Sequence, residues 1–312
     1  MYNNNRGENF LSNMCYLERR NLMKAVFLSS KGYADEAQNH GDSVLIDTGK
    51  ELVIFDCGCE EHARRVINYM NGHNYPKASF ILSHNDSDHF DGLPFLLNEG
   101  KISVVYTTLL LKHVDELLKI INDNRRNRET LKKQILEKYS NIAKLSGAPL
   151  KDIYADFYHL PEGVNIVGPS KQYMLKTAAK WLDSRESDQQ NGETAVNAPS
   201  IEVSVQVRDS LLLLCGDSAF APLKDILKDY TYIQLPHHGK PDLADKIFDS
   251  TDAVQTTYIV SDNTGNSNGG SDDLKTLGRR VKNTKHGDVT ISNETTGRYI
   301  TAPLSGACLG GW

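Results

Sequence analysis

Short apolar runs separated by polar turns recur through the first third of the chain and predict a β-rich beginning. Each run has the length and the bulky residues of a single strand, and the runs lie at 25–28, 43–47, 52–55 and 79–82. Gly49 and Lys50 separate the second run from the third, so these two runs are expected to form a hairpin. A helix is expected over 60–72, ended by Gly72.

The second half of the chain repeats this alternation. Further runs typical of strands lie at 165–167, 201–205, 211–215, 232–235 and 257–260. The run at 201–205 alternates apolar and polar residues, which predicts a half-buried strand, whereas the run at 211–215 is apolar throughout and predicts a central one. A closing hairpin is expected at 289–291 and 298–300. Two rounds of strands and helices predict two sheets in a sandwich, with helices outside.

The stretch from about 109 to 146 has a different period. Apolar residues recur there at helical spacing, at Leu110, Val114, Leu117, Leu118, Ile121, Leu131, Ile135, Ile142 and Leu145. This pattern predicts two helices that form a hairpin, inserted into the fold as a cap. The segment also carries a basic cluster of Arg125, Arg126, Arg128, Lys132 and Lys133. A solvated face with pairs such as Glu129–Lys133 explains this cluster, and a phosphate-facing patch is the alternative.

Charge narrows the classes of function. The chain has 312 residues, 35 Lys and Arg against 40 Asp and Glu, and a net charge of −5. This balance excludes a strongly basic nucleic-acid coat, in which many cationic side chains release counterions from the phosphate backbone. A site that binds phosphate locally through metal ions is not excluded.

The cysteines and the absence of long apolar runs indicate a cytoplasmic protein. Five scattered cysteines, Cys15, Cys57, Cys59, Cys215 and Cys308, are typical of reduced thiols rather than of a disulfide framework. No apolar run approaches the ~20 residues of a membrane span, and the first residues lack the apolar core of a signal peptide. Cys57 and Cys59 permit a metal or redox pair, but their place after the run at 52–55 favours two small residues at a strand end.

Acidic and imidazole side chains crowd the loop after the strand predicted at 79–82. Residues 83–92 include His84, Asp86, Asp88, His89 and Asp91. So many acids at close quarters raise one another's pKa, and a bound divalent cation removes this cost. Carboxylates and neutral imidazoles are ligands of zinc, manganese and iron. A polar surface turn that caps a helix is the alternative.

Two distant segments strengthen the metal interpretation. The central strand predicted at 211–215 is followed by Gly216 and Asp217, and the strand at 232–235 is followed by Pro236-His237-His238-Gly239. Each segment is ordinary alone, since Gly-Asp is a common turn. Together they place further candidate ligands directly after predicted strands.

These motifs resemble those of the metallo-β-lactamase fold hydrolases. Their loop signature is His-x-His-x-Asp-His, followed by a later His, a bridging Asp and a final His. Here His84, Asp88 and His89 match the loop, Asp217 matches the bridging Asp, and His237 matches the final His. Asp56-Cys57-Gly58 matches the early Asp-x-Gly. The resemblance implies an αββα sandwich with the helical hairpin as an insertion.

Asp86 stands where the signature has its second His, and this departure points to one branch. The hydrolase domain of ComEC-type competence proteins, with its stand-alone relatives, has His-x-Asp-x-Asp-His. Further segments resemble that branch: Gly41-Asp42-Ser43, Leu235-Pro236-His237-His238-Gly239, Val260-Ser261-Asp262-Asn263 and Thr284-Lys285-His286-Gly287-Asp288-Val289. The resemblance covers roughly 24–303. The family's third His is missing at 197–200, as is a substrate-side His near Gly270.

The resemblance implies two divalent ions, Mn²⁺ or Zn²⁺, with Mg²⁺ as a further option. One ion would take His84, Asp86 and Asp217, and the other would take Asp88, His89 and His237 together with the bridging Asp217. Oxygen ligands shift the preference from zinc toward manganese or magnesium. Water between two such ions becomes the nucleophile, and Asp88 would hold it or accept its proton. His238 would donate to the leaving group or a phosphate oxygen, or would orient a ligand.

We therefore expect a two-metal phosphodiesterase or nuclease that acts on a phosphate-containing substrate, such as a nucleotide or nucleic acid. A carbonyl-ester or lactone hydrolase is one alternative. Another is a partner-dependent subunit of a larger assembly, such as a defence complex, with the helical insertion as the contact for a protein partner or a second copy. The expected organisation is a polar tail at 1–22, a hydrolase domain at 23–305 with the insertion at about 109–158, and a C-terminal tail at 306–312.

Overall fold

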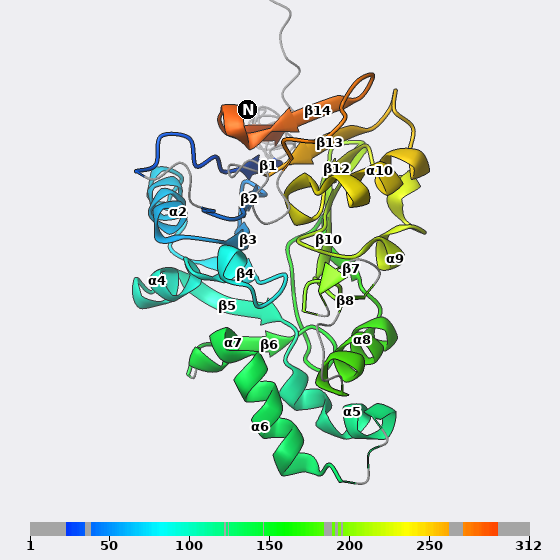
Figure 1. Cartoon of the computed structure of the whole chain (residues 1–312). Coiled ribbons are helices and arrows are strands. Elements are labelled where there is room, and N and C mark those ends of the chain that lie inside the picture. The colour runs from blue at the N-terminus through cyan, green and yellow to red at the C-terminus, as the bar shows by residue number, and fades with distance from the viewer. Residues whose placement is uncertain are drawn as a thin grey trace, which may run out of the picture.

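Two β-sheets stand face to face, and helices cover their outer surfaces (Figure 1). The computed structural model describes residues 23–34, 39–121, 123, 125–145, 147–183, 189–190, 193–194, 196–261 and 271–292. The expected tails at 1–22 and 306–312, and the second strand of the closing hairpin at 298–300, lie outside the described residues. The predicted sandwich of two sheets with external helices is confirmed.

The first sheet, called sheet A here, has seven strands. In spatial order they are β15 (Val289–Ser292), β1 (Lys24–Phe27), β2 (Ser43–Asp47), β3 (Leu52–Cys57), β4 (Ala78–Ile81), β5 (Ile102–Thr107) and β6 (Leu150–Asp152). Pairing is antiparallel from β15 to β3 and parallel from β3 to β6. The hairpin predicted around Gly49 is confirmed as β2–β3.

One edge of sheet A is formed by the last described strand of the chain. β15 pairs with β1, so residues near 290 return to the beginning of the domain. Asp288, just before β15, accepts hydrogen bonds from the Ser29 backbone N–H at 2.9 Å and from the Arg65 guanidinium at 2.6 Å. These contacts hold the start of β15 against the N-terminal half.

The second sheet, sheet B, has six strands. Their spatial order is β14 (Arg280–Asn283), β13 (Thr257–Val260), β12 (Tyr232–Gln234), β11 (Ser210–Leu214), β10 (Glu202–Val207) and β7 (Val164–Gly168). β11 lies within the sheet, as its unbroken apolar sequence predicts. A separate two-stranded ribbon joins β8 (Gln189–Gln190) to β9 (Glu193–Thr194).

The main core lies between the sheets. Phe27, Phe55 and Ile81 of sheet A join Val205 and Leu214 of sheet B in one fully buried cluster. Burial of a side chain of this size stabilises the folded state by about 1.5–3 kcal/mol. The alternation along each strand sends the intervening residues to the outer face of the same sheet, where a second apolar layer requires helices to cover it.

Helices cover both outer faces. Sheet A packs against α2 (Glu60–Gly72) and α4 (Leu93–Asn98), and sheet B packs against α9 (Phe220–Leu223) and α10 (Pro241–Ser250). On the sheet A side, Ile54 and Phe80 contact the cluster that contains Val66 of α2. On the sheet B side, Ile233 and Tyr258 join a cluster with α10. The resulting order of layers is α-β-β-α.

A helical lobe extends from one end of the sandwich (Figure 1). It contains η1 (Leu110–His113), α5 (Val114–Ile121), α6 (Arg128–Lys138), α7 (Ser140–Lys144) and α8 (Lys171–Asp183). Leu117, Leu131 and Leu182 lie in its own apolar core, separate from the main one. Residues 150–152, within the stretch expected to be the insertion, form strand β6 of sheet A.

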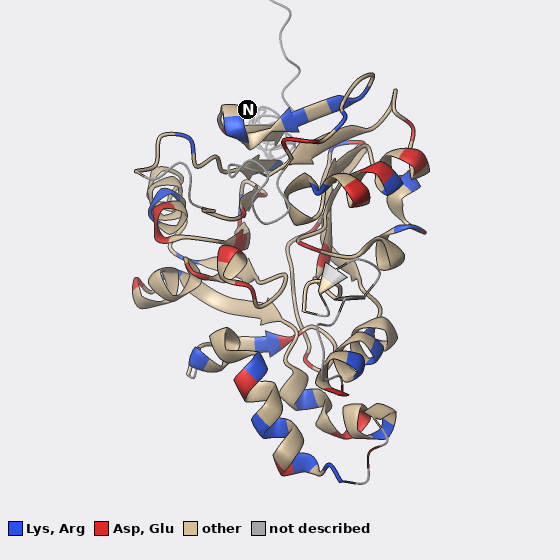
Figure 2. Cartoon of the chain, in the orientation of Figure 1, with Lys and Arg blue, Asp and Glu red and all other residues tan. Residues whose placement is uncertain are grey.

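The ion pairs of the lobe differ from the expected ones. Lys132 donates to Glu129, and Lys133 lies 3.9 Å from Glu137, so the expected Glu129–Lys133 pair is wrong. Figure 2 shows Lys and Arg along α6 and α8. These side chains form the solvated, paired face that the sequence favoured. Within the described residues, no helix combines the length and the apolar character of a membrane span.

Candidate metal centre

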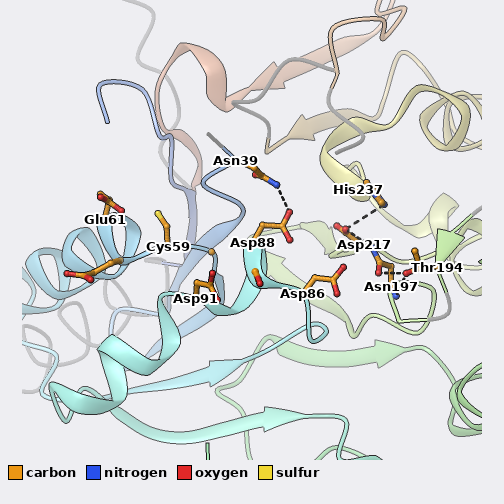
Figure 3. Close-up of a pocket in the computed structure, with 13 residues that line it drawn as sticks. Asn39, Cys59, Glu61, Asp86, Asp88, Asp91, Thr194, Asn197, Asp217 and His237 are labelled. Atoms are coloured by element: carbon orange, nitrogen blue, oxygen red, sulfur yellow. Dashed lines mark hydrogen bonds and ion pairs between the residues drawn. The ribbon is translucent and has the colours of Figure 1, made fainter. Parts of the chain in front are cut away.

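Three loops meet at one rim of the sandwich, and each follows a strand directly. His84 follows β4, and Asp88 and His89 lie in the short helix α3 (Ser87–Phe90). Asp217 follows β11, and His237 begins the turn η3 (His237–Gly239) after β12. Figure 3 shows Asp88, Asp217 and His237 around one hollow. The candidate ligands of both sheets therefore come together, as their positions after strands predict.

The backbone around this rim is held in an unusual conformation. Asp56, His237 and His238 have φ angles of 58°, 53° and 54°, in the left-handed region. Such a conformation costs a non-glycine residue on the order of 1–3 kcal/mol, and it persists only where surrounding contacts fix the backbone. The strain directs the two imidazoles of η3 to different surroundings.

Asp217 lies at the centre of the cluster, and its two carboxylate oxygens face different groups. Oδ1 lies 3.2 Å from His89 Nε2. Oδ2 lies 3.8 Å from His84 Nε2 and 3.6 Å from His237 Nδ1. A carboxylate with two separate sets of neighbours has the arrangement of a bridging ligand. His237 shares an oxygen with His84, whereas the resemblance groups His237 with His89.

Asp86 lies at the more open side of the cluster. It is the N-cap residue of α3, and its Oδ2 lies 3.7 Å from His84 Nε2. Its side chain is 42% exposed, whereas that of His84 is 2% exposed. Asp86 thus contacts His84 on one side and is exposed to solvent on the other.

A buried carboxylate fixes the orientation of both imidazoles of the loop. Asp56 Oδ2 lies 2.8 Å from His89 Nδ1 and accepts a hydrogen bond from Ser83 Oγ at 2.6 Å. Ser83 Oγ lies 2.9 Å from His84 Nδ1. Because the serine proton points to the carboxylate, His84 Nδ1 must be the donor to Ser83. Both imidazoles therefore carry a proton on Nδ1, and each directs Nε2 toward Asp217.

Asp88 is oriented from two sides. Its Oδ2 accepts a hydrogen bond from Asn39 Nδ2 at 2.7 Å and lies 3.0 Å from His238 Nε2. The other ring nitrogen of His238 lies 2.9 Å from the Ser261 carbonyl and 3.2 Å from Asp42 Oδ1. His238 is buried with both nitrogens in these contacts, and this geometry favours an orienting role over direct contact with a substrate.

The cluster shifts the pKa values of its members in opposite directions. Burial opposes ionisation of Asp88, but the neighbouring imidazoles of His89 and His238 hold its pKa well below the usual range. Burial also opposes charge on His89, yet the carboxylates of Asp217, Asp56 and Asp88 raise its pKa well above the usual value. The cluster therefore favours ionised acids beside protonated imidazoles, and a bound cation would replace the protons of those imidazoles as the compensating charge.

The donor set fits divalent cations. His84 Nε2, His89 Nε2 and Asp217 Oδ1 are all buried, and none makes a hydrogen bond within the part of the chain that the structure describes. Atoms of His84, His89 and Asp217 lie within 4.8 Å of one another, as do atoms of Asp88, His89 and His238. Buried polar atoms without partners are costly, and coordination of a cation would satisfy all three.

Sequence reasoning missed two amides at this site. Asn39 donates to Asp88, and Asn197 Nδ2 donates to Asp217 Oδ2 at 3.2 Å. Asn197 also accepts a hydrogen bond from the Thr194 hydroxyl. The missing third His at 197–200 was the available signal, because Asn197 stands in that segment. Its amide therefore contacts the central carboxylate of the cluster.

The cluster opens into a cleft of about 870 Å³. Six carboxylic acids line it: Glu60, Glu61, Asp86, Asp88, Asp91 and Asp217. None of the described lining residues is Lys or Arg. The electrostatic field in the cleft therefore favours cations, and an anionic ligand would need bound cations to offset these acids.

One family model is similar to the N-terminal half of the domain. Residues 38–154 match the family model described as Metallo-beta-lactamase superfamily. The match covers the part of the chain that carries His84, Asp88 and His89, and the two-sheet sandwich has the order of layers of the metallo-β-lactamase fold. A comparison with curated proteins gave no match.

Solved structures with a similar fold share little sequence with this chain. The metallo-β-lactamase fold protein YhfI from Bacillus subtilis is 12% identical over 86% of this chain and 99% of its own, with a TM-score of 0.46. A diphosphatase from the PhnP family is 11% identical over 86% and 97%, with a TM-score of 0.43. Igni18, a metallo hydrolase from Ignicoccus hospitalis, is 11% identical over 87% and 99%, with a TM-score of 0.44.

Proposed function

We propose that this protein is a metal-dependent phosphodiesterase or nuclease with two divalent cations. The observation that carries the proposal is the position of Asp217, whose two oxygens face separate imidazoles. In this proposal His84, Asp86, Asp88, His89, Asp217 and His237 are the metal ligands. Bound divalent cations would polarise the scissile ester and make water a better nucleophile at neutral pH.

The preference for a phosphate ester over a carbonyl ester rests on the donor types. Asp86 places a carboxylate where the family signature has an imidazole, and its Oδ2 lies 3.7 Å from His84 Nε2. Oxygen donors favour Mn²⁺ or Mg²⁺ over Zn²⁺, and such cations suit the several charged oxygens of a phosphoryl group. A lactone offers one neutral carbonyl, which gains less from a second cation.

Side chains of this protein would position the proposed ligand Asp88. Asn39 and His238 hold Asp88 Oδ2, which leaves Asp88 Oδ1 as the atom that would bind a cation in this proposal. His238 serves as a positioning residue in this proposal. The cleft lacks cationic side chains among its described lining residues, so recognition of the phosphate would depend on the cations. A nucleotide or short oligonucleotide suits this charge better than long duplex DNA.

The test uses hydrolysis of bis-p-nitrophenyl phosphate by the full chain loaded with Mn²⁺ or Zn²⁺. Asp88→Asn and His237→Ala are expected to lower kcat at least a hundredfold, because each removes a proposed ligand. Asp91→Asn is the matched control, since Asp91 lines the same cleft outside the proposed ligand set. Activity unchanged in the first two variants would contradict the proposal.

Two other outcomes point to the alternative functions. Faster hydrolysis of a lactone or p-nitrophenyl acetate than of the phosphodiester would favour a carbonyl-ester hydrolase. Bound metal without turnover of either substrate would favour a subunit that needs a partner. For that case we propose the part of the helical lobe from η1 to α7 as the contact surface for a partner or a second copy.

A further inference from the structure

We propose a second kind of cation site in the cleft, formed by His40, Cys59 and Glu61 and selective for zinc-type divalent ions. It uses none of the ligands proposed for the hydrolytic centre and does not depend on the proposed function. One donor atom from each of these residues lies within 4.8 Å of the other two. Imidazole, thiolate and carboxylate are the three donor types that bind zinc in proteins.

The site is open on one side. His40 is buried, Cys59 is partly buried and Glu61 is exposed. Cys59 and Glu61 line the cleft, and Figure 3 shows them at the start of α2, on the opposite side of the cleft from His237. Three protein ligands would leave a fourth coordination position directed to solvent, where water or a ligand atom can bind.

Close backbone contacts hold the two halves of this site together. Gly58, next to Cys59, donates its N–H to the Asp42 carbonyl at 2.9 Å. A Cβ at Gly58 would lie 2.6 Å from the His40 carbonyl and 2.2 Å from the Asp88 carbonyl. Only glycine permits this approach, so the segment of His40 and the segment of Cys59 touch through their backbones. The fold thus holds the two segments that carry these donors against each other.

A neighbouring imidazole is excluded by its contacts. His62 Nε2 lies 3.2 Å from the Gly41 carbonyl and must donate to it, so Nδ1 accepts from the Tyr33 hydroxyl at 2.9 Å. Both nitrogens of His62 are therefore in use. The imidazole of the proposed site is that of His40, because one of its ring nitrogens lies within 4.8 Å of donor atoms of Cys59 and Glu61.

Cys59 has the features of a metal-binding thiol. It is the N-cap residue of α2, a helix of 13 residues, and its sulfur accepts a hydrogen bond from the His62 N–H at 3.4 Å. A helix N-terminus stabilises a thiolate. Burial and the Glu61 carboxylate instead raise the pKa of the thiol to about 11. A cation that coordinates the sulfur would therefore release the thiol proton to solvent.

The acidity of the cleft supplies an independent reason for a cation here. Glu60 and Glu61 lie beside Cys59, and no Lys or Arg belongs to the described lining. The hydrolytic ligands account for the carboxylates of Asp86, Asp88 and Asp217. A cation held by Cys59 would offset the remaining acids on the α2 side of the cleft.

Cobalt titration tests the proposal, because a Co²⁺–thiolate bond gives a charge-transfer band in the near ultraviolet. The proposed hydrolytic ligands contain no sulfur, so their occupation gives visible bands only. We expect the near-ultraviolet band in the full-length chain and its loss in Cys59→Ser. His40→Ala should weaken the affinity that this band reports at least tenfold, since even outer groups around a metal change affinity by about 10–100-fold.

The controls separate this site from other thiols and from misfolding. Serine is a good N-cap, so Cys59→Ser should keep α2, and circular dichroism will check this. A Cys15→Ser/Cys308→Ser double variant should retain the band. Visible cobalt bands without the near-ultraviolet band in the unmodified chain would overturn the proposal, and so would an undiminished band in Cys59→Ser.

Discussion

The buried carboxylate of Asp56 offers the sharpest test of how the metal centre is organised. Asp56→Asn keeps the size of the side chain, and asparagine tolerates the left-handed backbone at this position, where φ is 58°. Asparagine replaces one acceptor oxygen with an amide donor. In the position of Oδ2 this donor would face His89 Nδ1 and Ser83 Oγ, at the present distances of 2.8 Å and 2.6 Å.

The substitution reverses two hydrogen-bond chains at once. His89 Nδ1 would have to accept, so its proton would move to Nε2. Ser83 would accept from the introduced amide and donate to His84 Nδ1, so the proton of His84 would also move to Nε2. Loss of one such outer partner lowers metal affinity about 10–100-fold. Because one change disturbs two ligands, we expect a loss of about a hundredfold, or ~2.7 kcal/mol.

Competition with a chromophoric chelator measures this affinity, and ¹⁵N spectra of the imidazoles report their tautomers. Replacement of charged by neutral hydrogen bonds should lower the free energy of unfolding by only about 1–2 kcal/mol. Asp47→Asn is the matched control, since Asp47 is a buried acceptor for Tyr69 and Tyr75 on the same sheet and outside the cluster. Unchanged metal affinity in Asp56→Asn, or an equal loss in Asp47→Asn, would refute the reasoning.

Three further predictions concern metal choice, pH and metal removal. Asp86→His replaces an oxygen donor with an imidazole and should raise the ratio of bound Zn²⁺ to Mn²⁺, measured by mass spectrometry after loading with equal concentrations; an unchanged ratio contradicts it. Burial lowers the pKa of His62 from 6.5 to about 4, so below pH 6.5 the unfolded chain binds a proton at this imidazole that the folded chain does not. The free energy of unfolding should therefore be highest above pH 6.5 and fall by about 3 kcal/mol as the pH is lowered to 4. Urea unfolding at several pH values should show a smaller loss in His62→Gln. Chelation should lower Tm by more in the unmodified chain than in Asp217→Ala, since free metal at a hundred times Kd stabilises by about 2.7 kcal/mol.

The strands that sequence reasoning found are those with strong apolar patterns. β2, β3 and β11 are buried along most of their length, so their sequences carry an unambiguous signal. β5, β6 and β14 were missed. β6 and β14 lie at sheet edges, where lysine, arginine and aspartate replace apolar residues, whereas β5 lies within sheet A and has an apolar sequence. Backbone pairing at an edge needs no apolar side chain, and such a strand is hard to distinguish from a loop.

The candidate ligands were predictable from their position after strands, but their supporting groups were not. Asparagine is a common turn residue, so the contacts of Asn39 and Asn197 depend on loop conformations that the sequence does not specify. The role of His238 stayed open for a related reason. Its direction depends on a φ of 54°, and an ordinary negative φ would turn the ring elsewhere.

Because β15 pairs with β1, loss of the end of the domain would affect the solubility of the chain but would leave the proposed metal ligands in place. A shortened form that ends before Val289 would retain every proposed ligand, since the last of them, His237, lies much earlier. The same form would leave one edge of β1 with unpaired N–H and C=O groups. Open edges of this kind recruit strands from other molecules. Premature termination would therefore produce chains that retain the proposed ligands but self-associate through sheet A.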